Sequence, residues 1–148
     1  MKTTAEAAVR PVTELDITEI TRIDEKIRGH YHPEEWETRI RYYIRRDAEG
    51  SLVAECDGKV VGFMLGEVRS GEFGLSEPTG WIEVMGIDPD YQGRAVGTRL
   101  AEQMLSHFRR RGATVVRTLV GDEMKPIRSF FESLGFEPAP MRALFKRL

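Results

Sequence analysis

The chain has 148 residues, of which 22 are basic and 24 acidic, so its formal net charge is −2 at pH 7. This balance gives no strong positive field, so we expect neither a nucleic-acid-binding protein nor one held at an anionic membrane. The length fits a single domain over residues 1–148, and the sequence offers no apolar run long enough to span a bilayer and no secretory signal, so we expect a cytoplasmic protein.

The first half of the chain predicts a strand, two helices and a hairpin. Thr13 or Asp16 can cap the first helix, and Pro33 suits the first position of the second, where a missing N–H costs nothing. Asp57-Gly58 favours the left-handed conformation of a two-residue hairpin turn. In order, we expect a strand over 8–12, a helix ending at 29, a helix over 32–47, and strands over 52–56 and 59–68.

The second half predicts alternating strands and helices. Val96, Leu100, Met104 and Phe108 recur at every fourth position, which indicates the buried stripe of a helix, and Gly112 can end it. In order, we expect a loop over 70–79, a strand over 81–87, a helix over 93–111, a strand over 113–120, a helix over 126–134 and an extended tail with a last strand over 141–146. The series predicts one α/β unit.

The turn after Ile87 combines features of an anion site. A helix that opens after a glycine-bearing turn presents backbone N–H groups without intrahelical partners, and its dipole adds about half a positive charge there. Gly93 and Gly97 permit close approach of a phosphate to the main chain, and Arg94 and Arg99 add positive charge. The spacing matches neither a P-loop nor a dinucleotide-binding fingerprint. From these residues alone, a phosphate ligand and a helix start without a ligand remain equally open.

Two short motifs in the second half of the chain carry a resemblance to a known family. The first motif is Ile87-Asp88-Pro89 followed by Gln92-Gly93-Arg94-Ala95-Val96-Gly97. It resembles the pattern of the GNAT family of acyl-CoA-dependent N-acetyltransferases, a strand ending V-x-P and then [QR]-x-x-G-x-[GA]. Ala95 replaces the first glycine of this pattern. The second motif, an aromatic pair followed by G-F, corresponds to Phe130-Phe131 and Gly135-Phe136. The resemblance is strongest over residues 51–137.

The resemblance implies an α/β GNAT fold with acetyl-CoA as cosubstrate. It implies a central mixed, twisted sheet of six to seven strands with about four helices, splayed between the strand ending at Ile87 and the strand starting near Ala113. The pantetheine arm would lie in that gap and the pyrophosphate at the turn. The cofactor-binding residues implied are Met85, Ile87, Gln92, Gly93, Arg94, Ala95, Val96, Gly97, Thr98 and Phe131.

Acetyl transfer to an amine needs a group that accepts a proton, and Glu83 is our candidate base, with Glu67 as second choice. Strand alternation places Trp81, Glu83, Met85 and Ile87 on one face, so partial burial would make the Glu83 carboxylate more basic. The alternative is that Glu83 forms a structural ion pair, for which Arg117 on the next strand is the possible partner. A main-chain N–H near Met85 would stabilise the oxyanion.

The position at which many GNAT enzymes carry a proton-donating tyrosine is Phe131. The chain is therefore either an acetyltransferase without that acid, or one using Tyr42 or Tyr43, or a CoA-binding sensor or interaction domain without catalysis. The acceptor we expect is a primary amine on a small molecule, a protein N-terminus or a lysine. The resemblance implies that segments 29–36 and 70–79 border its site. A homodimer is compatible, and we expect no metal site, since His30 and His32 lack a third ligand.

Overall fold

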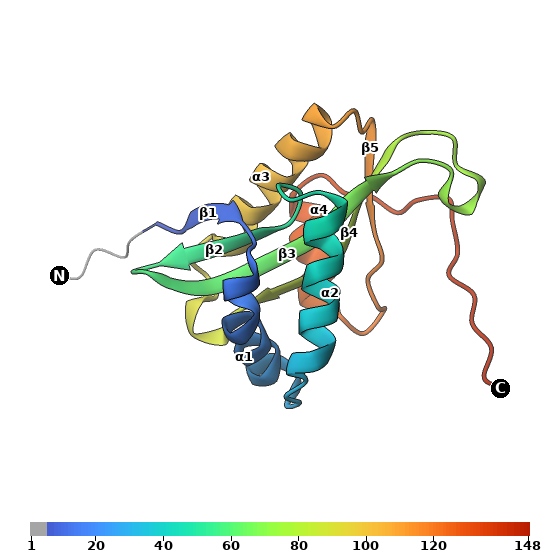
Figure 1. The fold of residues 1–148 in the computed structure, drawn as a ribbon. Helices are drawn as coiled ribbons and strands as arrows, with labels where there is room; N and C mark the ends of the chain where they lie inside the picture. The colour runs from blue at the N-terminus through green and yellow to red at the C-terminus, as the bar shows by residue number, and fades with distance from the viewer. Residues whose placement is uncertain (1–5) are drawn as a thin grey trace.

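The computed structural model describes residues 6–148, which fold around one mixed sheet of five strands in the order β1-β2-β3-β4-β5 (Figure 1). Neighbours from β1 to β4 are antiparallel, and β5 runs parallel to β4. The strands are β1 (Ala8–Pro11), β2 (Leu52–Cys56), β3 (Lys59–Arg69), β4 (Thr79–Ile87) and β5 (Val115–Thr118). The α/β class and the mixed sheet are as predicted.

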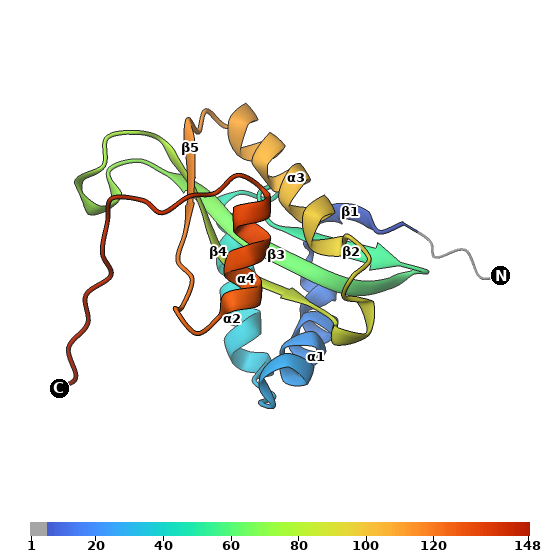
Figure 2. The same ribbon diagram turned by 180° about the vertical axis from the view of Figure 1, so that it is seen from behind.

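Four α-helices cover the sheet, two on each face. Helices α1 (Ile17–Arg28) and α2 (Pro33–Arg46) lie on one face, and α3 (Val96–Arg110) and α4 (Lys125–Ser133) on the other, as the two opposite views show (Figures 1 and 2). Three short 3-10 turns complete the chain: η1 (Glu14–Asp16), η2 (Glu72–Gly74) and η3 (Pro89–Tyr91). Within residues 6–148, no helix has the length and apolar character needed to cross a membrane.

Strand β3 supplies both halves of the hydrophobic core. Its residues are buried almost throughout, so alternate side chains pack against opposite helix layers. Phe63 and Leu65 join the cluster under α1 and α2, and Met64 joins the cluster under α3 and α4. Because β3 packs against both helix layers, its neighbour β4 is also held between these layers.

Several local predictions are confirmed. The hairpin between β2 and β3 turns at Asp57-Gly58, whose φ angles of 53° and 76° lie in the left-handed region. Thr13 and Asp16 form a reciprocal capping box at the turn before α1, and Gly29 closes that helix with φ 78°.

The predicted sheet of six to seven strands is wrong in number, because the structure has five. Residues 141–146, predicted as a last strand, are extended but pair with no other part of the described chain. A strand needs a hydrogen-bonded neighbour, which a local sequence preference cannot supply. Strand β5 is also shorter than the predicted 113–120.

A β-bulge at Glu83 changes the direction of the side chains along β4. Leu65 pairs with Val84 but Gly66 pairs with Ile82, so Glu83 is an extra residue on β4. Gly66 is required there, since a methyl group on it would collide with the Trp81 carbonyl oxygen.

We predicted that one face of β4 carries Trp81, Glu83, Met85 and Ile87. The bulge makes this prediction wrong. Met85 and Ile87 pack against the cluster under α3 and α4, whereas the Glu83 carboxylate meets Tyr43 of α2 on the opposite face. Because of the extra residue, the side chains at positions 83 and 85 point to opposite faces of the sheet instead of to the same face.

Strands β4 and β5 separate halfway along β4. Pairing runs from Thr79 with Val115 to Ile82 with Thr118 and stops there, although β4 continues to Ile87. At the last pair, Thr118 Oγ1 donates a hydrogen bond of 2.8 Å to the Ile82 carbonyl oxygen. Residues 83–87 therefore have no strand partner on this side, and the predicted splay is confirmed.

Candidate functional site

The turn between β4 and α3 is anchored by the buried carboxylate of Asp88. Its oxygens accept hydrogen bonds from Lys26 Nζ of α1 at 3.0 Å and from the Asp90 N–H at 2.9 Å, and its own N–H donates to Val61 O at 2.8 Å. Burial would raise the pKa of Asp88, but these hydrogen bonds and nearby lysines hold the pKa below its usual value. This anchoring role of Asp88 was not predicted from the sequence, although Asp before Pro favours a turn.

The backbone then passes through two left-handed residues before the helix starts. Gly93 has φ 79° and Ala95 has φ 61°. Helix α3 begins at Val96, three residues later than predicted, and its first hydrogen bond joins Arg99 N–H to Ala95 O at 3.0 Å. The N–H groups of residues 96–98 thus have no intrahelical acceptor, which leaves them available for an anion.

The predicted phosphate-binding residues differ in what they can offer. The residues Gln92, Gly93, Arg94 and Ala95 are exposed, and Gly97 and Thr98 are half-buried. Val96 is 2% exposed, so its side chain belongs to the core and its backbone alone could meet a ligand. Arg94 lies over the Tyr91 ring at 5.0 Å. Arg99 is held away from the turn, because its Nε donates to Ala7 O at 2.6 Å.

Gly97 has a packing role that the sequence did not predict. A methyl group at this position would lie 3.2 Å from Cε1 and 3.3 Å from Cζ of Phe130. The missing side chain therefore lets α3 and α4 approach, rather than leaving open space beside the main chain.

The unpaired part of β4 lies beside an aromatic cluster from α4. Met85 and Ile87 are half-buried there. Phe131 is 4% exposed, and its ring lies 5.1 Å from Phe130 and 5.0 Å from Phe136 between centroids. Phe131 is thus a core residue that offers an apolar wall and no transferable proton.

On the opposite face, Glu83 belongs to a network of tyrosines and charges. Tyr43 Oη donates to Glu83 Oε1 at 2.9 Å, and Arg69 Nη2 pairs with the same oxygen. Arg69 Nε also donates to Glu67 Oε1 at 2.5 Å, and Tyr42 Oη donates to that oxygen at 2.8 Å. The Glu83 carboxylate therefore does sit in an ion pair, which was the structural alternative for this residue.

The partner in that pair is Arg69, so the predicted pair with Arg117 is wrong. Arg117 lies opposite Trp81 across β4 and β5, and its Nη2 is 4.0 Å from Glu77. The bulge explains why the partner of Glu83 is Arg69 and not Arg117, because it turns Glu83 toward α2.

Exposure separates the two candidate bases. The Glu83 side chain is 33% exposed and that of Glu67 only 3%. Burial would raise the pKa of Glu67, but hydrogen bonds from Arg69 and Tyr42 hold that pKa below its usual value. Burial and the neighbouring Glu83 charge raise the pKa of the Tyr43 hydroxyl, so it remains a hydrogen-bond donor at neutral pH. The Glu83 carboxylate is thus more accessible than that of Glu67.

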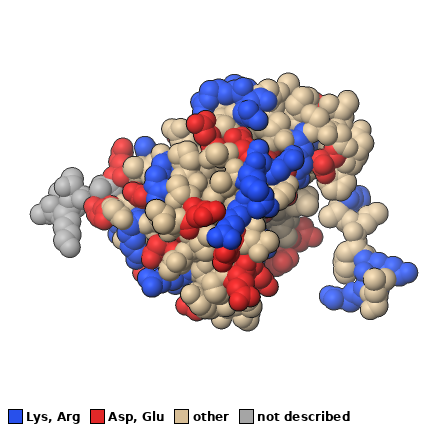
Figure 3. All heavy atoms as spheres, in the orientation of Figure 1, with Lys and Arg blue, Asp and Glu red and all other residues tan. Residues whose placement is uncertain are grey.

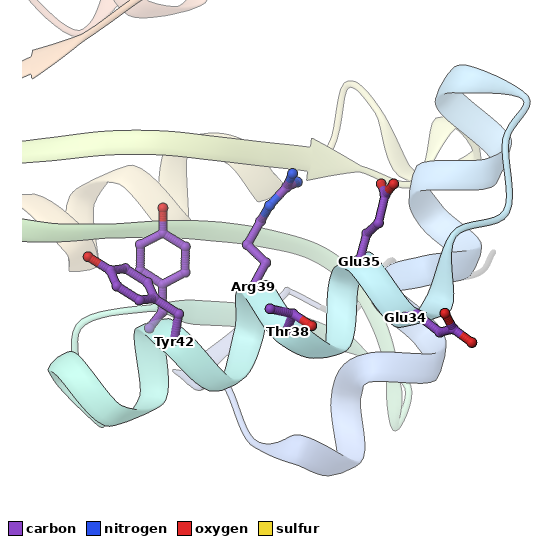
Figure 4. A pocket seen from close by; sticks show the side chains of 6 residues that line it. Glu34, Glu35, Thr38, Arg39 and Tyr42 are labelled. Atoms are coloured by element: carbon purple, nitrogen blue, oxygen red, sulfur yellow. The ribbon is translucent and has the colours of Figure 1, made fainter.

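An open pocket of about 610 Å³ lies along α2 next to this network. Its lining residues are Glu34, Glu35, Thr38, Arg39, Tyr42 and Tyr43 (Figure 4). Figure 4 shows the Glu35 and Arg39 side chains extending toward the strands, on the same side as the tyrosines. Tyr43 both lines the pocket and donates to Glu83, so its side chain links the pocket wall to the carboxylate.

The pocket only partly matches the segments implied for the acceptor. Glu34 and Glu35 fall within 29–36, but no residue of 70–79 lines it. The wall formed by Arg39 and the two tyrosines was not predicted as part of an acceptor site. Their spacing along α2, at one face of a helix, was the available signal.

Solved structures with the same fold include an aminoglycoside N-acetyltransferase, AAC(6')-Iy, in complex with CoA. It superimposes with a TM-score of 0.84 over 99% of this chain and 97% of that one, at 17% identity. Ard1 from Thermoplasma volcanium superimposes with a TM-score of 0.73 at 25% identity, over 90% of this chain and 84% of that one.

Sequence relatives include an uncharacterized N-acetyltransferase of Methanocaldococcus jannaschii, 30% identical over 135 residues, and a mycothiol acetyltransferase of Thermobifida fusca, 39% identical over 95 residues. The alignments cover 87% and 62% of this chain but only 60% and 29% of these relatives' own lengths. The model of the Acetyltransferase (GNAT) family matches residues 17–136. The chain belongs to the GNAT acetyltransferase family.

Proposed function

We propose that the protein transfers an acetyl group from acetyl-CoA to a primary amine, with Glu83 as the proton acceptor. One observation supports this most strongly. The point at which β4 loses its partner β5 is also the point at which Glu83 bulges toward the α2 pocket. One strand therefore separates a slot suited to the pantetheine arm from a carboxylate that an amine could reach.

The residues around the turn fit the coenzyme. Acetyl-CoA is the cosubstrate of the GNAT family, and its diphosphate would meet the free N–H groups of residues 96–98 at the positive end of α3. No atom lies within 4 Å of a methyl group built on Gly93, so the backbone there is open to a ligand. The main chain at Met85 and Ile87, which does not pair with β5, would hold the pantetheine amides.

Glu83 would take the proton of the attacking ammonium, directly or through a water molecule. Tyr43 and Arg69 fix the position of the carboxylate. A cationic amine competes with Arg69 for it, so the ion pair rearranges when the acceptor binds. A main-chain N–H near Met85 would stabilise the oxyanion of the tetrahedral intermediate.

The departing thiolate needs no tyrosine at Phe131. A thiol has a pKa of about 8.5, so the thiolate can leave unaided or take a proton from water. Tyr43 is a poor acid for this step, because its pKa is raised and its hydroxyl proton is bound to Glu83.

For the acceptor we propose a small-molecule amine. The relatives and structural neighbours named for mycothiol and aminoglycosides support this class, as does a pocket that combines carboxylates with aromatic rings. The second candidate, a CoA-binding domain without catalysis, is favoured by the methyl group of Ala95 in the turn and by the missing hydroxyl at Phe131.

Thiol release from acetyl-CoA in the presence of a panel of amines tests the proposal. We expect release that depends on at least one small amine and yields an equal amount of N-acetylated product. The reaction without an amine measures hydrolysis and serves as the control. Thermal stabilisation by CoA without release for any amine would favour the non-catalytic candidate.

A further inference from the structure

Arg39 supplies the positive charge in the lining of the α2 pocket. The residue is exposed, and among the residues that the structure describes none accepts a hydrogen bond from its side chain or forms an ion pair with it. The guanidinium instead lies over the Trp36 ring, 4.8 Å from the ring centroid. A guanidinium stacked in this way keeps its N–H donors free for a planar acceptor such as a carboxylate.

The Trp36 ring that supports this guanidinium is fixed on both sides. Its Nε1 donates a hydrogen bond of 3.0 Å to Asp24 Oδ2 of α1. The ring also packs edge-on against Phe63 of β3, with 5.2 Å between centroids, and Trp36 is buried. Arg39 therefore rests on a rigid support, which lowers the cost of ordering its side chain when a ligand binds.

The residue best placed on α2 to neutralise Arg39 does not pair with it. Glu35 precedes Arg39 by four positions, a spacing that favours an ion pair on a helix. Glu37 and Arg41 have the same spacing on the same helix and do pair, at 2.8 Å. Glu35 and Arg39, both within the described part of the chain, do not, and Figure 4 shows their side chains extending separately toward the strands. The Arg39 charge is therefore left for a group from outside the chain.

Arg39 lies about one helical turn from the residue that holds the proposed base. Tyr43 follows Arg39 by four positions, which is about 6 Å along a helix axis, and both residues line the pocket. The Tyr43 hydroxyl donates to Glu83 Oε1 at 2.9 Å. A ligand along this wall would thus meet a cation first and then, about one turn farther, the hydroxyl that binds the Glu83 carboxylate.

The surface around the pocket has no dominant charge that would select a ligand by itself. Figure 3, seen from the side of α1 and α2, shows acidic and basic side chains interspersed over this face. Long-range attraction needs a patch of one sign. Selection in the pocket therefore depends on individual groups such as Arg39.

We propose that Arg39 selects an acceptor that carries a carboxylate as well as the reacting amine, so that the substrate class is a small amino acid. This inference rests on the proposed function, because it assigns the amine to Glu83. The carboxylate accepts hydrogen bonds from the Arg39 guanidinium, a charge-assisted contact that is well matched in shape. A simple alkylamine leaves Arg39 unpaired, and a diamine brings a second positive charge toward it.

Calorimetric titration with matched ligands tests the inference without catalysis. The ligands are an unbranched amino acid with a terminal amine, the alkylamine and the terminal diamine, in sets of two, four and six carbon atoms. Each is titrated into the full chain with and without CoA, which carries no acetyl group and so permits binding without reaction. In at least one set the amino acid should bind more tightly than both partners of equal length.

Arg39→Gln should weaken binding of that amino acid by about fivefold or more, because the charge-assisted pair is lost, and should leave alkylamine binding unchanged. Arg39→Glu should reverse the preference toward the diamine. Arg41→Gln is the matched control, since Arg41 lies on the same helix but pairs with Glu37 and does not line the pocket. It should change none of the affinities.

Two results would overturn the inference: an amino acid that binds no better than its alkylamine in any set, or an Arg39→Gln variant that loses affinity equally for all ligands. Failure of the proposed function has a different signature. It would appear as binding that depends on the carboxylate and on Arg39, without thiol release from acetyl-CoA.

Discussion

Glu83 shows how the surroundings of one residue set its chemistry. The carboxylate is one-third exposed and is bound by Arg69 and by Tyr43, whose side chain lines an open pocket. Arg69 also pairs with Glu67, so it keeps a carboxylate partner when an incoming ammonium takes its place at Glu83. The pairing and the proposed role as base are therefore compatible.

Glu83→Gln should lower the rate of acetyl transfer by about 10²- to 10⁴-fold, because the amide keeps the size of the side chain but cannot accept the proton. Unfolding in urea should show a change in stability of no more than about 1 kcal/mol. Glu67→Gln is the matched control and should affect stability more than rate, since Glu67 is buried. A Glu83→Gln rate within threefold of wild type would exclude Glu83 as the base.

Ala95 holds a backbone conformation that favours glycine. Its left-handed φ of 61° costs roughly 1–2 kcal/mol, whereas glycine adds roughly 0.5–1 kcal/mol of unfolded-chain entropy. Ala95→Gly should therefore stabilise the protein by about 0.5–1 kcal/mol and tighten CoA binding. Ala101→Gly, within α3, should have the opposite effect on stability. Denaturant titration and calorimetry measure these changes, and a destabilised Ala95→Gly variant would contradict the strain.

At the scale of elements, the site depends on how β4 is tied to its neighbours. Strand β3 sets the bulge, β5 ends the pairing at Ile82, and Asp88 fastens the following turn to α1. These contacts position the free N–H groups of α3 beside the unpaired part of β4.

Asp88→Asn should reduce stability at pH 7, and its difference from wild type should shrink in acid. The folded pKa of Asp88 lies below its unfolded value of about 3.9, so the folded state binds fewer protons. The stabilisation is thus present above about pH 4 and is lost as the pH falls through the folded pKa. Denaturation at pH 7 and pH 3 measures both values.

Asp90→Asn is the matched control for Asp88→Asn, because Asp90 is 76% exposed and lies 3.4 Å from the same lysine. It should change stability by no more than about 0.5 kcal/mol. A constant difference between Asp88→Asn and wild type from pH 7 to pH 3 would show that the Asp88 charge does not stabilise the turn.

Gly97→Ala should destabilise the contact between α3 and α4. Overpacking against Phe130 costs about 1–3 kcal/mol, which equals or exceeds the gain of about 1 kcal/mol from alanine in a helix. Phe130→Leu removes the ring, so Gly97→Ala should cost less in that background. A double-mutant cycle from urea unfolding measures this coupling, and strictly additive effects would contradict the packing role.

At the scale of the whole molecule, the sequence predicted what local chemistry controls. The hairpin at Asp57-Gly58, the cap at Thr13, the order of elements and the family all follow from residues close together in the chain. The sequence did not predict the features that depend on residues far apart in the chain. Lys26 meets Asp88 across 62 positions, and the bulge at Glu83 arises from a mismatch with β3.

The C-terminal segment, residues 137–148, is the clearest case of this limit. Residues 141–146 favour an extended conformation, so predicting a strand there was reasonable, but no neighbour within the described chain completes it. Pattern alone cannot distinguish a strand paired within a chain from one paired between chains.

The central claim is that acetyl-CoA binds along the unpaired part of β4 with its diphosphate at the start of α3. Hydrogen exchange with and without acetyl-CoA tests it most directly, with pantetheine, which lacks the diphosphate, as the matched ligand. We predict that acetyl-CoA slows exchange at residues 83–87 and 92–98, and that pantetheine at saturation slows it at 83–87 alone. Unchanged exchange at 92–98 with saturating acetyl-CoA would contradict the account.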